Sequence, residues 1–228
     1  MTILFTKKIV EKQVIEKLDK EITPAFLEVL NFKIKTLNTF PLNSKSLIFT
    51  SVKGVESFFQ NQFSPKENFS MSPYNKIYCV GIKTKLKIKE FGFGVFKTLK
   101  NAKDLSDFII EKSNREDFLH FCGNLTLDIL DEKLPLQSIK YQKVECYETE
   151  LIYPKANQNY DALVFFSPSG VRSFTKHNSL EHSTLFSIGD TTSAEIKKIT
   201  KKNIITSQEQ NLKSLLNLIN KHFESDNL

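Results

Sequence analysis

The sequence contains one strand–turn–helix pattern twice, and this repeat restricts what the chain can fold into. Residues 47–58 read LIFTSVKGVESF and residues 163–174 read LVFFSPSGVRSF, with seven of the twelve aligned positions identical. In each copy a strand-like apolar run ends near a serine, a short polar turn follows, and an amphipathic helical pattern begins. The repeat predicts two similar lobes better than it predicts one extended sheet.

A second pair of segments extends the repeat. Residues 77–90 read IYCVGIKTKLKIKE and residues 185–198 read LFSIGDTTSAEIKK, and each is a strand, a glycine, two residues, a threonine and a helix. Strands that alternate with helices along the whole chain indicate right-handed βαβ units and parallel sheets. We also expect a helix over 125–133, directly after a Gly-Asn turn, and one over 208–223 with Ser207 as its cap.

Two long extended runs interrupt this alternation. They read AFLEVLNFKIKTLNTF (25–40) and SIKYQKVECYETELIYP (138–154), and each is longer than one strand needs to be. A chain that crosses between lobes twice would produce them. We therefore expect a discontinuous lobe of residues 1–35 plus 149–228 and a continuous lobe of residues 36–148. Tyr147 lies in the second run, where it either faces the cleft between the lobes or is a strand tyrosine with its hydroxyl in water.

The charge of the chain favours a small anionic partner or a merely solvated surface. The net charge is +6, and lysine supplies nearly all of it because Arg115 and Arg172 are the only arginines. Proteins that grip nucleic acid usually use more arginine, whose planar fork recognises phosphate and guanine. We expect no nucleic-acid partner.

Several other classes of protein are disfavoured. The cysteines Cys79, Cys122 and Cys146 are odd in number and far apart, so neither a disulfide framework nor a metal site is expected. No Walker loop, GxGxxG, HExxH or GxSxG motif occurs. No apolar run approaches the ~20 residues that span a bilayer, and the first residues do not resemble a secretory signal. We expect a cytoplasmic protein without a membrane partner.

The candidate site residues lie where strands end and helices begin. Helix starts have unpaired N–H groups that favour anions, and ligands of open α/β sheets bind beyond the carboxyl ends of the strands. Serine and threonine at such positions are helix caps in most proteins, so each residue alone is a weak candidate. The collective prediction rests on their recurrence at equivalent turns of both lobes. The turn residues are Ser51, Thr84, Gly123, Asn124, Ser167, Ser169, Gly170 and Thr192.

In these motifs the chain resembles the uroporphyrinogen-III synthase family. The segment at 47–58 is similar to the strand–turn–helix of that family's first lobe, YCVGIKT (78–84) to its VGxxT segment, and FCGN (121–124) to its Gly-Asn turn. The segments at 160–174 and 187–196 are similar to the paired segments of the other lobe. The resemblance covers most of the chain, and it rests on the order and spacing of loose motifs.

The resemblance implies a fold, a reaction and a set of residues. It implies two flavodoxin-like α/β lobes, each with a parallel sheet, joined by a two-stranded β ladder. It implies a monomeric lyase of haem biosynthesis that cyclises the linear tetrapyrrole hydroxymethylbilane to uroporphyrinogen III, with loss of water, inversion of ring D and no cofactor. Tyr147 takes the place of the tyrosine proposed to assist departure of the hydroxyl. Thr84 and Thr192 match positions that line the family's cleft, and the other turn residues match its turns.

The sequence departs from the family at one turn and leaves one alternative open. The family's Gly-Pro-Thr-Thr pattern is here Gly189-Asp190-Thr191-Thr192, so Asp190 adds a negative charge near an expected carboxylate site. Two similar lobes around a cleft also describe a binding protein for a small anionic ligand. Such a cytoplasmic binding protein is the alternative to the enzyme.

Overall fold

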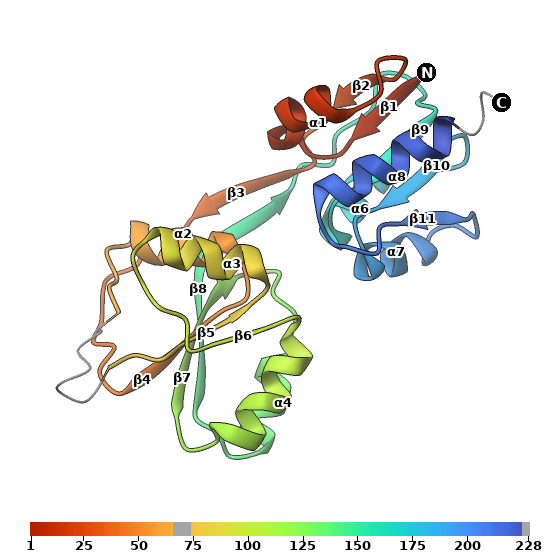
Figure 1. Ribbon diagram of the computed structural model, residues 1–228. Coiled ribbons are helices and arrows are strands. Elements are labelled where there is room, and N and C mark those ends of the chain that lie inside the picture. The colour runs from red at the N-terminus through yellow and green to blue at the C-terminus, as the bar shows by residue number, and fades with distance from the viewer. Residues whose placement is uncertain (66–73, 225–228) are drawn as a thin grey trace. The chain divides into compact units, whose positions relative to one another are not determined.

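The chain forms two compact units in the computed structural model, which describes residues 1–65 and 74–224 (Figure 1). One unit comprises Met1–Asn31 and Glu150–Leu228, and the other comprises Phe32–Thr149. We call them the terminal unit and the central unit. Each has a sheet of mainly parallel strands with helices on both faces, which is the architecture expected of alternating strands and helices.

The terminal unit has a five-stranded parallel sheet in the order β11-β10-β9-β1-β2. Counted along the chain this order is 2-1-3-4-5, which is the flavodoxin-like order. Its strands are β1 (Thr2–Phe5), β2 (Thr23–Phe26), β9 (Ala162–Phe165), β10 (Thr184–Ser187) and β11 (Ile204–Thr206). Its helices are η1 (Lys8–Val10), α1 (Glu11–Lys17), α6 (Pro168–Thr175), α7 (Asp190–Lys197) and α8 (Leu212–Glu224).

The sheet of the central unit has six strands in the order β3-β8-β7-β4-β5-β6. Reading from β6 to β8 gives the same spatial arrangement as β11 to β2, but the strands equivalent to β1 and β2 come last in the chain instead of first. The two units therefore share one fold with circularly permuted connections. Its strands are β3 (Leu30–Ile34), β4 (Lys45–Phe49), β5 (Ile77–Val80), β6 (Lys97–Leu99), β7 (Asp117–Gly123) and β8 (Tyr141–Leu151), and its helices are α2 (Val52–Gln60), α3 (Ile82–Glu90), α4 (Ala102–Lys112) and α5 (Ile129–Leu136).

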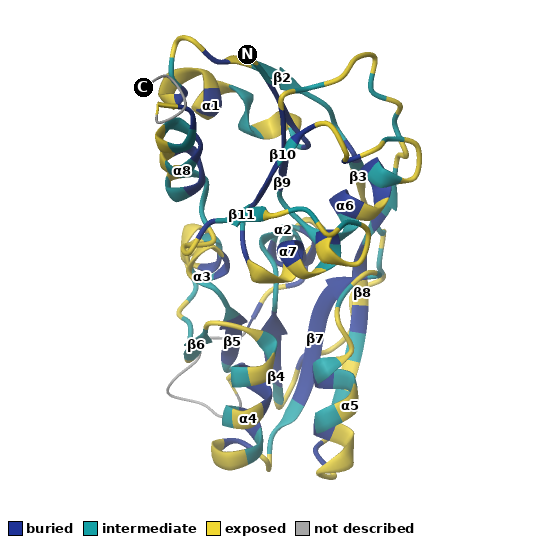
Figure 2. Ribbon diagram, turned by 90° about the vertical axis from the view of Figure 1, so that its right-hand side faces the viewer, coloured by how far each residue is buried: buried dark blue, intermediate teal, exposed yellow. Residues whose placement is uncertain are grey.

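The central strands of the sheets are largely buried (Figure 2). Alternation along them builds a core on each face of each sheet. On β4, Leu47 and Phe49 pack with α2 and α3, while Ile48 packs with α4 and α5. On β9, Leu163 and Phe165 pack with α6 and α7, while Val164 packs with α1 and α8. Strands buried on both faces explain the continuous apolar runs of the repeat.

The chain passes between the units twice, in two neighbouring strands, β3 and β8. The N–H of Lys35 donates to the carbonyl of Cys146, and the N–H of Ile152 donates to that of Val29. As residue numbers rise on one strand, those of the partner fall, so the two strands run antiparallel. The expected fold of two parallel-sheet lobes joined by a two-stranded ladder is confirmed.

The structure corrects several expected local elements. The extended run over 25–40 is not one strand, because its first part divides between β2 and β3. β7 continues through Gly123, and the next helix begins at Ile129 instead of Leu125. Helix α8 begins at Leu212, where Asn211 Oδ1 accepts from the N–H of Ser214 at 2.8 Å. Ser207 is not its cap, because its hydroxyl donates to the carbonyl of Glu209 within the preceding turn.

The described helices include none that is both long and apolar enough to cross a membrane. Within residues 1–65 and 74–224, no group of three or more His, Cys, Asp or Glu side chains is placed to hold a metal ion. The three cysteines are buried and unbonded to one another.

His120 is a polar residue inside the central unit. It lies on β7 with no exposed surface, between Thr50 Oγ1 at 2.9 Å from Nε2 and the Tyr141 hydroxyl at 2.7 Å from Nδ1. Burial lowers its pKa to about 3. The imidazole is therefore neutral in the folded protein, while the unfolded chain takes up a proton near pH 6.5.

We predict that His120 makes the protein less stable as the pH falls. Below pH 6.5 the unfolded state binds more protons than the folded state, so the free energy of unfolding falls with pH. The contribution of His120 to that free energy is complete above pH 6.5 and is lost progressively toward pH 3. From pH 7.5 to pH 5 the loss is about 2 kcal/mol at ~1.36 kcal/mol per pKa unit. Urea denaturation at both pH values measures it. His120→Gln, which keeps a donor and an acceptor, should show a smaller loss; an equal loss in the two proteins would contradict the prediction.

Candidate functional site

Each repeated serine turn lies at the carboxyl edge of its sheet. It follows a strand, β4 or β9, that borders the point where the order of the strands reverses. Such a switch point is the usual ligand site of an open α/β sheet. Ser51 follows β4 and accepts from the N–H of Gly54 at 3.0 Å, which caps α2. Ser167 follows β9 and accepts from the N–H of Gly170 at 3.1 Å, which caps α6. The first role of these two serines is thus helix capping.

The glycine–threonine turns start the next helix of each unit without a side-chain cap. Gly81 precedes α3 and Gly189 precedes α7, and as glycines they have no side chain with which to cap these helices. Gly81 has a φ of 82°, a conformation that favours glycine. Thr84 and Thr192 are the third residues of these helices and are buried, with 4% and 1% of their surface exposed. The cap residue therefore places no side chain at the positive end of either helix dipole.

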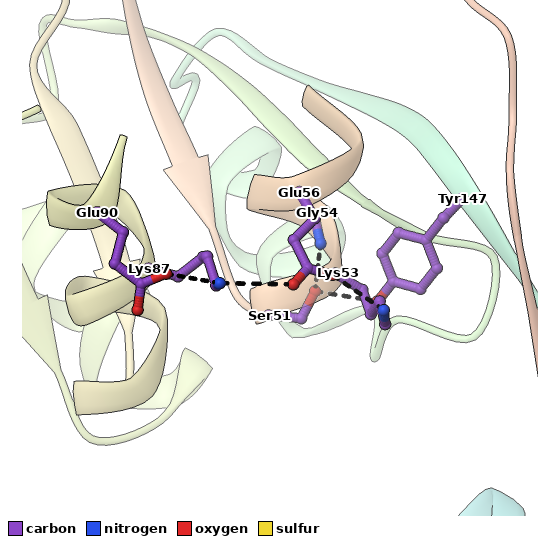
Figure 3. A network of polar contacts seen from close by, with 7 residues as sticks. All are labelled: Ser51, Lys53, Gly54, Glu56, Lys87, Glu90 and Tyr147. Carbon is purple, nitrogen blue, oxygen red and sulfur yellow. Dashed lines mark hydrogen bonds and ion pairs between the residues drawn. The ribbon is translucent and has the colours of Figure 1, made fainter. Parts of the chain in front are cut away.

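Tyr147 meets Ser51 at the carboxyl edge of the central unit. Figure 3 shows its ring directed at the start of α2, with the phenol oxygen 3.0 Å from Ser51 Oγ. The same Oγ accepts from Gly54, so it links the helix start to the phenol. Burial raises the pKa of Tyr147, which keeps the phenol protonated at neutral pH. The arrangement provides a fixed neutral hydrogen-bond donor.

Gly123 makes room for this tyrosine. A Cβ at Gly123 would lie 2.4 Å from Tyr147 Cε2 and 2.9 Å from its hydroxyl oxygen. Asn124, the next residue, exchanges two hydrogen bonds with the backbone of Thr149 on β8, one from the Thr149 N–H at 2.8 Å and one to its carbonyl at 3.3 Å. The Gly-Asn turn therefore fixes the end of β7 against β8 at Tyr147 and Thr149.

The predicted site residues fall into two groups, one in each unit. Ser51, Gly123, Asn124 and Tyr147 come together in the central unit, and Thr84 lies on the helix after the next strand. In the terminal unit, Ser169 Oγ lies 3.4 Å from Ser167 Oγ, and Gly170 is part of the same turn. Thr192 lies on the neighbouring helix.

Sequence reasoning missed residues that shape these edges. Lys53 and Glu56 on α2 form a chain of ion pairs with Lys87 and Glu90 on α3 (Figure 3). In the terminal unit, Gln210 covers the start of α7, where a Cβ on Gly189 would lie 2.8 Å from Gln210 Cγ. The pairs within one helix, Lys53–Glu56 and Lys87–Glu90, are visible in the sequence as opposite charges three residues apart. The pair between the helices gives no such signal, and neither does Gln210, because its contact depends on the loop after β11.

The two equivalent edges carry different charge. The central unit has 18 basic and 13 acidic residues, a net charge of +5, and the terminal unit has 14 and 13, a net charge of +1. Lys83 and Lys85 lie in the first turns of α3 and form no ion pair with a described carboxylate, whereas Lys87 is paired. At the start of α7 the corresponding exposed charge is Asp190. Beside Gly81 the space is open, unlike that beside Gly189.

The fold and the site define a protein of two α/β lobes whose carboxyl edges suit anions and, in one lobe, hold a neutral phenol. Residues 21–217 match the family model described as Uroporphyrinogen-III synthase HemD. The chain therefore belongs to the uroporphyrinogen-III synthase family, whose members are lyases of haem biosynthesis. The resemblance found in the sequence is confirmed, and the comparisons give no support to the alternative of a binding protein.

Solved structures agree with this fold. Uroporphyrinogen-III synthetase from Helicobacter pylori is 18% identical, with a TM-score of 0.68 over 97% of this chain and 99% of that chain. A mutant uroporphyrinogen III synthase from Thermus thermophilus is 12% identical, with a TM-score of 0.67 over 99% of each chain. Among curated proteins, no sequence matches the chain.

We predict that Gly123→Ala destabilises the protein through Tyr147. The added methyl overlaps the ring, and overpacking of this kind costs about 1–3 kcal/mol. In a Tyr147→Ala background the same substitution should cost much less, because the ring is absent. Urea denaturation of the four proteins gives the coupling free energy. Equal losses in both backgrounds would show that the cost arises elsewhere.

Proposed function

We propose that this chain catalyses the closure of hydroxymethylbilane to uroporphyrinogen III, as a monomer in the cytoplasm. The family match over residues 21–217 carries the proposal for the activity. The hydrogen bond between Tyr147 and Ser51 carries the proposal for the site. We further propose that residues 1–35 with 149–228 form one lobe and that residues 36–148 form the other, with substrate bound at the two carboxyl edges.

Tyr147 assists departure of the ring A hydroxyl. The C–O bond of the hydroxymethyl group breaks with electrons from the pyrrole nitrogen, the oxygen leaves as water with the pyrrole N–H proton, and an azafulvene remains. Ring D then attacks the azafulvene methylene through its substituted carbon to form a spiro intermediate. The older methylene bond to that carbon breaks and forms again at the free α carbon of ring D, which loses its proton, so ring D is inverted. A phenol whose pKa is raised by burial resists full loss of its proton, so it acts by donating a hydrogen bond to the leaving oxygen. Ser51 holds the phenol oxygen in place.

The turns hold the substrate's eight carboxylates. The free N–H groups at the starts of α3 and α7 and the hydroxyls of Thr84 and Thr192 are donors for carboxylate oxygens. Ser51, Gly123 and Asn124 line the edge of the central unit, and Ser167, Ser169 and Gly170 line that of the terminal unit. These donors fix one conformation of a substrate whose own pyrroles supply the nucleophile, and positioning is the main contribution of the protein.

The start of α3 is the stronger carboxylate subsite. Lys83 and Lys85 add positive charge to the helix dipole there, and the space beside Gly81 is open. Asp190 and the covering Gln210 side chain oppose a carboxylate at the start of α7. The central unit therefore takes the larger share of the anionic side chains.

The activity is tested with freshly generated hydroxymethylbilane, followed by isomer analysis of the oxidised porphyrin. The proposal expects type III product at a rate proportional to enzyme concentration. Spontaneous closure gives type I, so type I as the sole product at any enzyme concentration would refute the activity.

We predict that Tyr147→Phe folds normally and loses about 10²-fold or somewhat less in kcat. That is the low end of the range for positioned acid catalysis, because the pyrrole nitrogen helps to expel the hydroxyl. The residual product should remain mostly type III, since inversion depends on the conformation held by all the turns. Tyr153→Phe, which changes an exposed tyrosine, is the matched control and should leave kcat unchanged. A Tyr147→Phe enzyme with wild-type kcat would remove Tyr147 from the mechanism.

We predict opposite effects from changing the two helix starts. Lys83→Gln should weaken binding of uroporphyrin, an octacarboxylate, and reduce its salt dependence, while Asp190→Asn should strengthen binding. Each change should be several-fold in Kd at low salt. Lys112→Gln, at the far end of α4 beside Glu111, is the control and should have no effect. Fluorescence titration at two salt concentrations measures all four proteins. Weaker binding by Asp190→Asn would contradict the assignment.

A further inference from the structure

A β-bulge in β8 immediately precedes Tyr147. The strands β7 and β8 pair in parallel, one residue to one, from Phe118 with Tyr141 as far as Cys122 with Glu145. The next pair is Gly123 with Tyr147, so Cys146 is an extra residue on β8. Bulges are rare between parallel strands, and they recur next to active sites, where they redirect a side chain.

The bulge changes which face of the sheet Tyr147 occupies. Val144, before the bulge, and Cys146, within it, face α2. Tyr141 lies in the core on the opposite face. Regular alternation would place Tyr147 on the same side as Tyr141 and Glu145. With the extra residue, Tyr147 instead joins Val144 and Cys146 in the core beside α2. Only that face has Ser51 within reach of the phenol.

The thiol of Cys146 is enclosed between strand β7 and helix α2. Its Sγ lies 3.5 Å from the carbonyl oxygen of Cys122 on β7 and 3.8 Å from that of Gly54 on α2. The residue has no exposed surface. Helix α2 presents small residues here, because Gly54 and Ser57 are both buried. The cysteine fills the space between the helix and the bulged strand and donates its S–H to one of the two carbonyls.

We infer that Cys146 is a positioning residue: it holds the bulge that directs the Tyr147 hydroxyl at Ser51. The inference rests on the proposed role of Tyr147 for its effect on catalysis, but the positioning itself is a property of the fold. The thiol has no exposed surface, so the inference gives it no chemical role of its own.

The test compares Cys146→Ala and Cys146→Ser with wild type by tyrosine absorbance and by kinetics. A difference titration against Tyr147→Phe isolates the phenol of residue 147. In Cys146→Ala the phenol should titrate at lower pH than in wild type, because it becomes more exposed. The kcat should fall about tenfold, less than the ~10²-fold that a 1 Å misplacement can cost, with KM within twofold. Cys146→Ser keeps a donor and should recover most of both values.

Cys79→Ala is the matched control. Cys79 is an equally buried cysteine of the same sheet, on β5, with its Sγ 3.4 Å from Thr98 Oγ1. The Cys79→Ala variant should be less stable than wild type but should have the same tyrosine titration and the same kcat. An unchanged titration of residue 147 in Cys146→Ala, or the same shift in Cys79→Ala, would overturn the inference. A shift in titration without loss of kcat would uphold the positioning and refute the catalytic role proposed for Tyr147.

Discussion

Helix α2 approaches strand β7 so closely at Gly54 that no side chain fits between them. A Cβ there would lie 2.6 Å from the carbonyl oxygen of Phe121. This contact places the Ser51 cap beside the end of β7 and brings the Gly54 carbonyl to the thiol of Cys146. The phenol of Tyr147, the bulge in β8 and the turn at Gly123 are all arranged around it. The site is thus a consequence of backbone packing more than of reactive side chains.

The two units share one fold but differ in the packing and charge of their carboxyl edges. Their strand orders match after circular permutation, and each has a serine-capped helix followed by a glycine-started helix. In the terminal unit Gly170 is less tightly packed than Gly54, because a Cβ there would lie 3.3 Å from Val29 Cγ2. Among the described residues, no tyrosine hydroxyl bonds to Ser167. Most of the net charge also lies in the central unit. The two units share a scaffold, and local differences in sequence make their two edges different.

This division suits a reaction in which the substrate supplies most of the chemistry. A neutral buried phenol and a set of N–H donors can hold an octa-anion and promote loss of one hydroxyl without a strong acid or base. The proposed mechanism gives His120 no role, because its low pKa and its bonds to Thr50 and Tyr141 make it a neutral core residue. In the proposed mechanism catalysis depends on geometry, so residues that set geometry matter as much as those that contact substrate.

The sequence alone determined the duplicated fold and the helix caps at Ser51 and Ser167, and it singled out Tyr147 among the tyrosines. The fold and the caps follow from local signals: apolar runs, cap residues and a turn repeated at the same spacing. The sequence did not determine the start of α5, the cap of α8 or the position of Gln210, which depend on turns with several competing hydrogen bonds. The bulge at Cys146 was invisible for a stronger reason. A one-residue register shift leaves no mark on composition, yet it moves Tyr147 to the other face of the sheet, and only the pairing of β7 with β8 decides it.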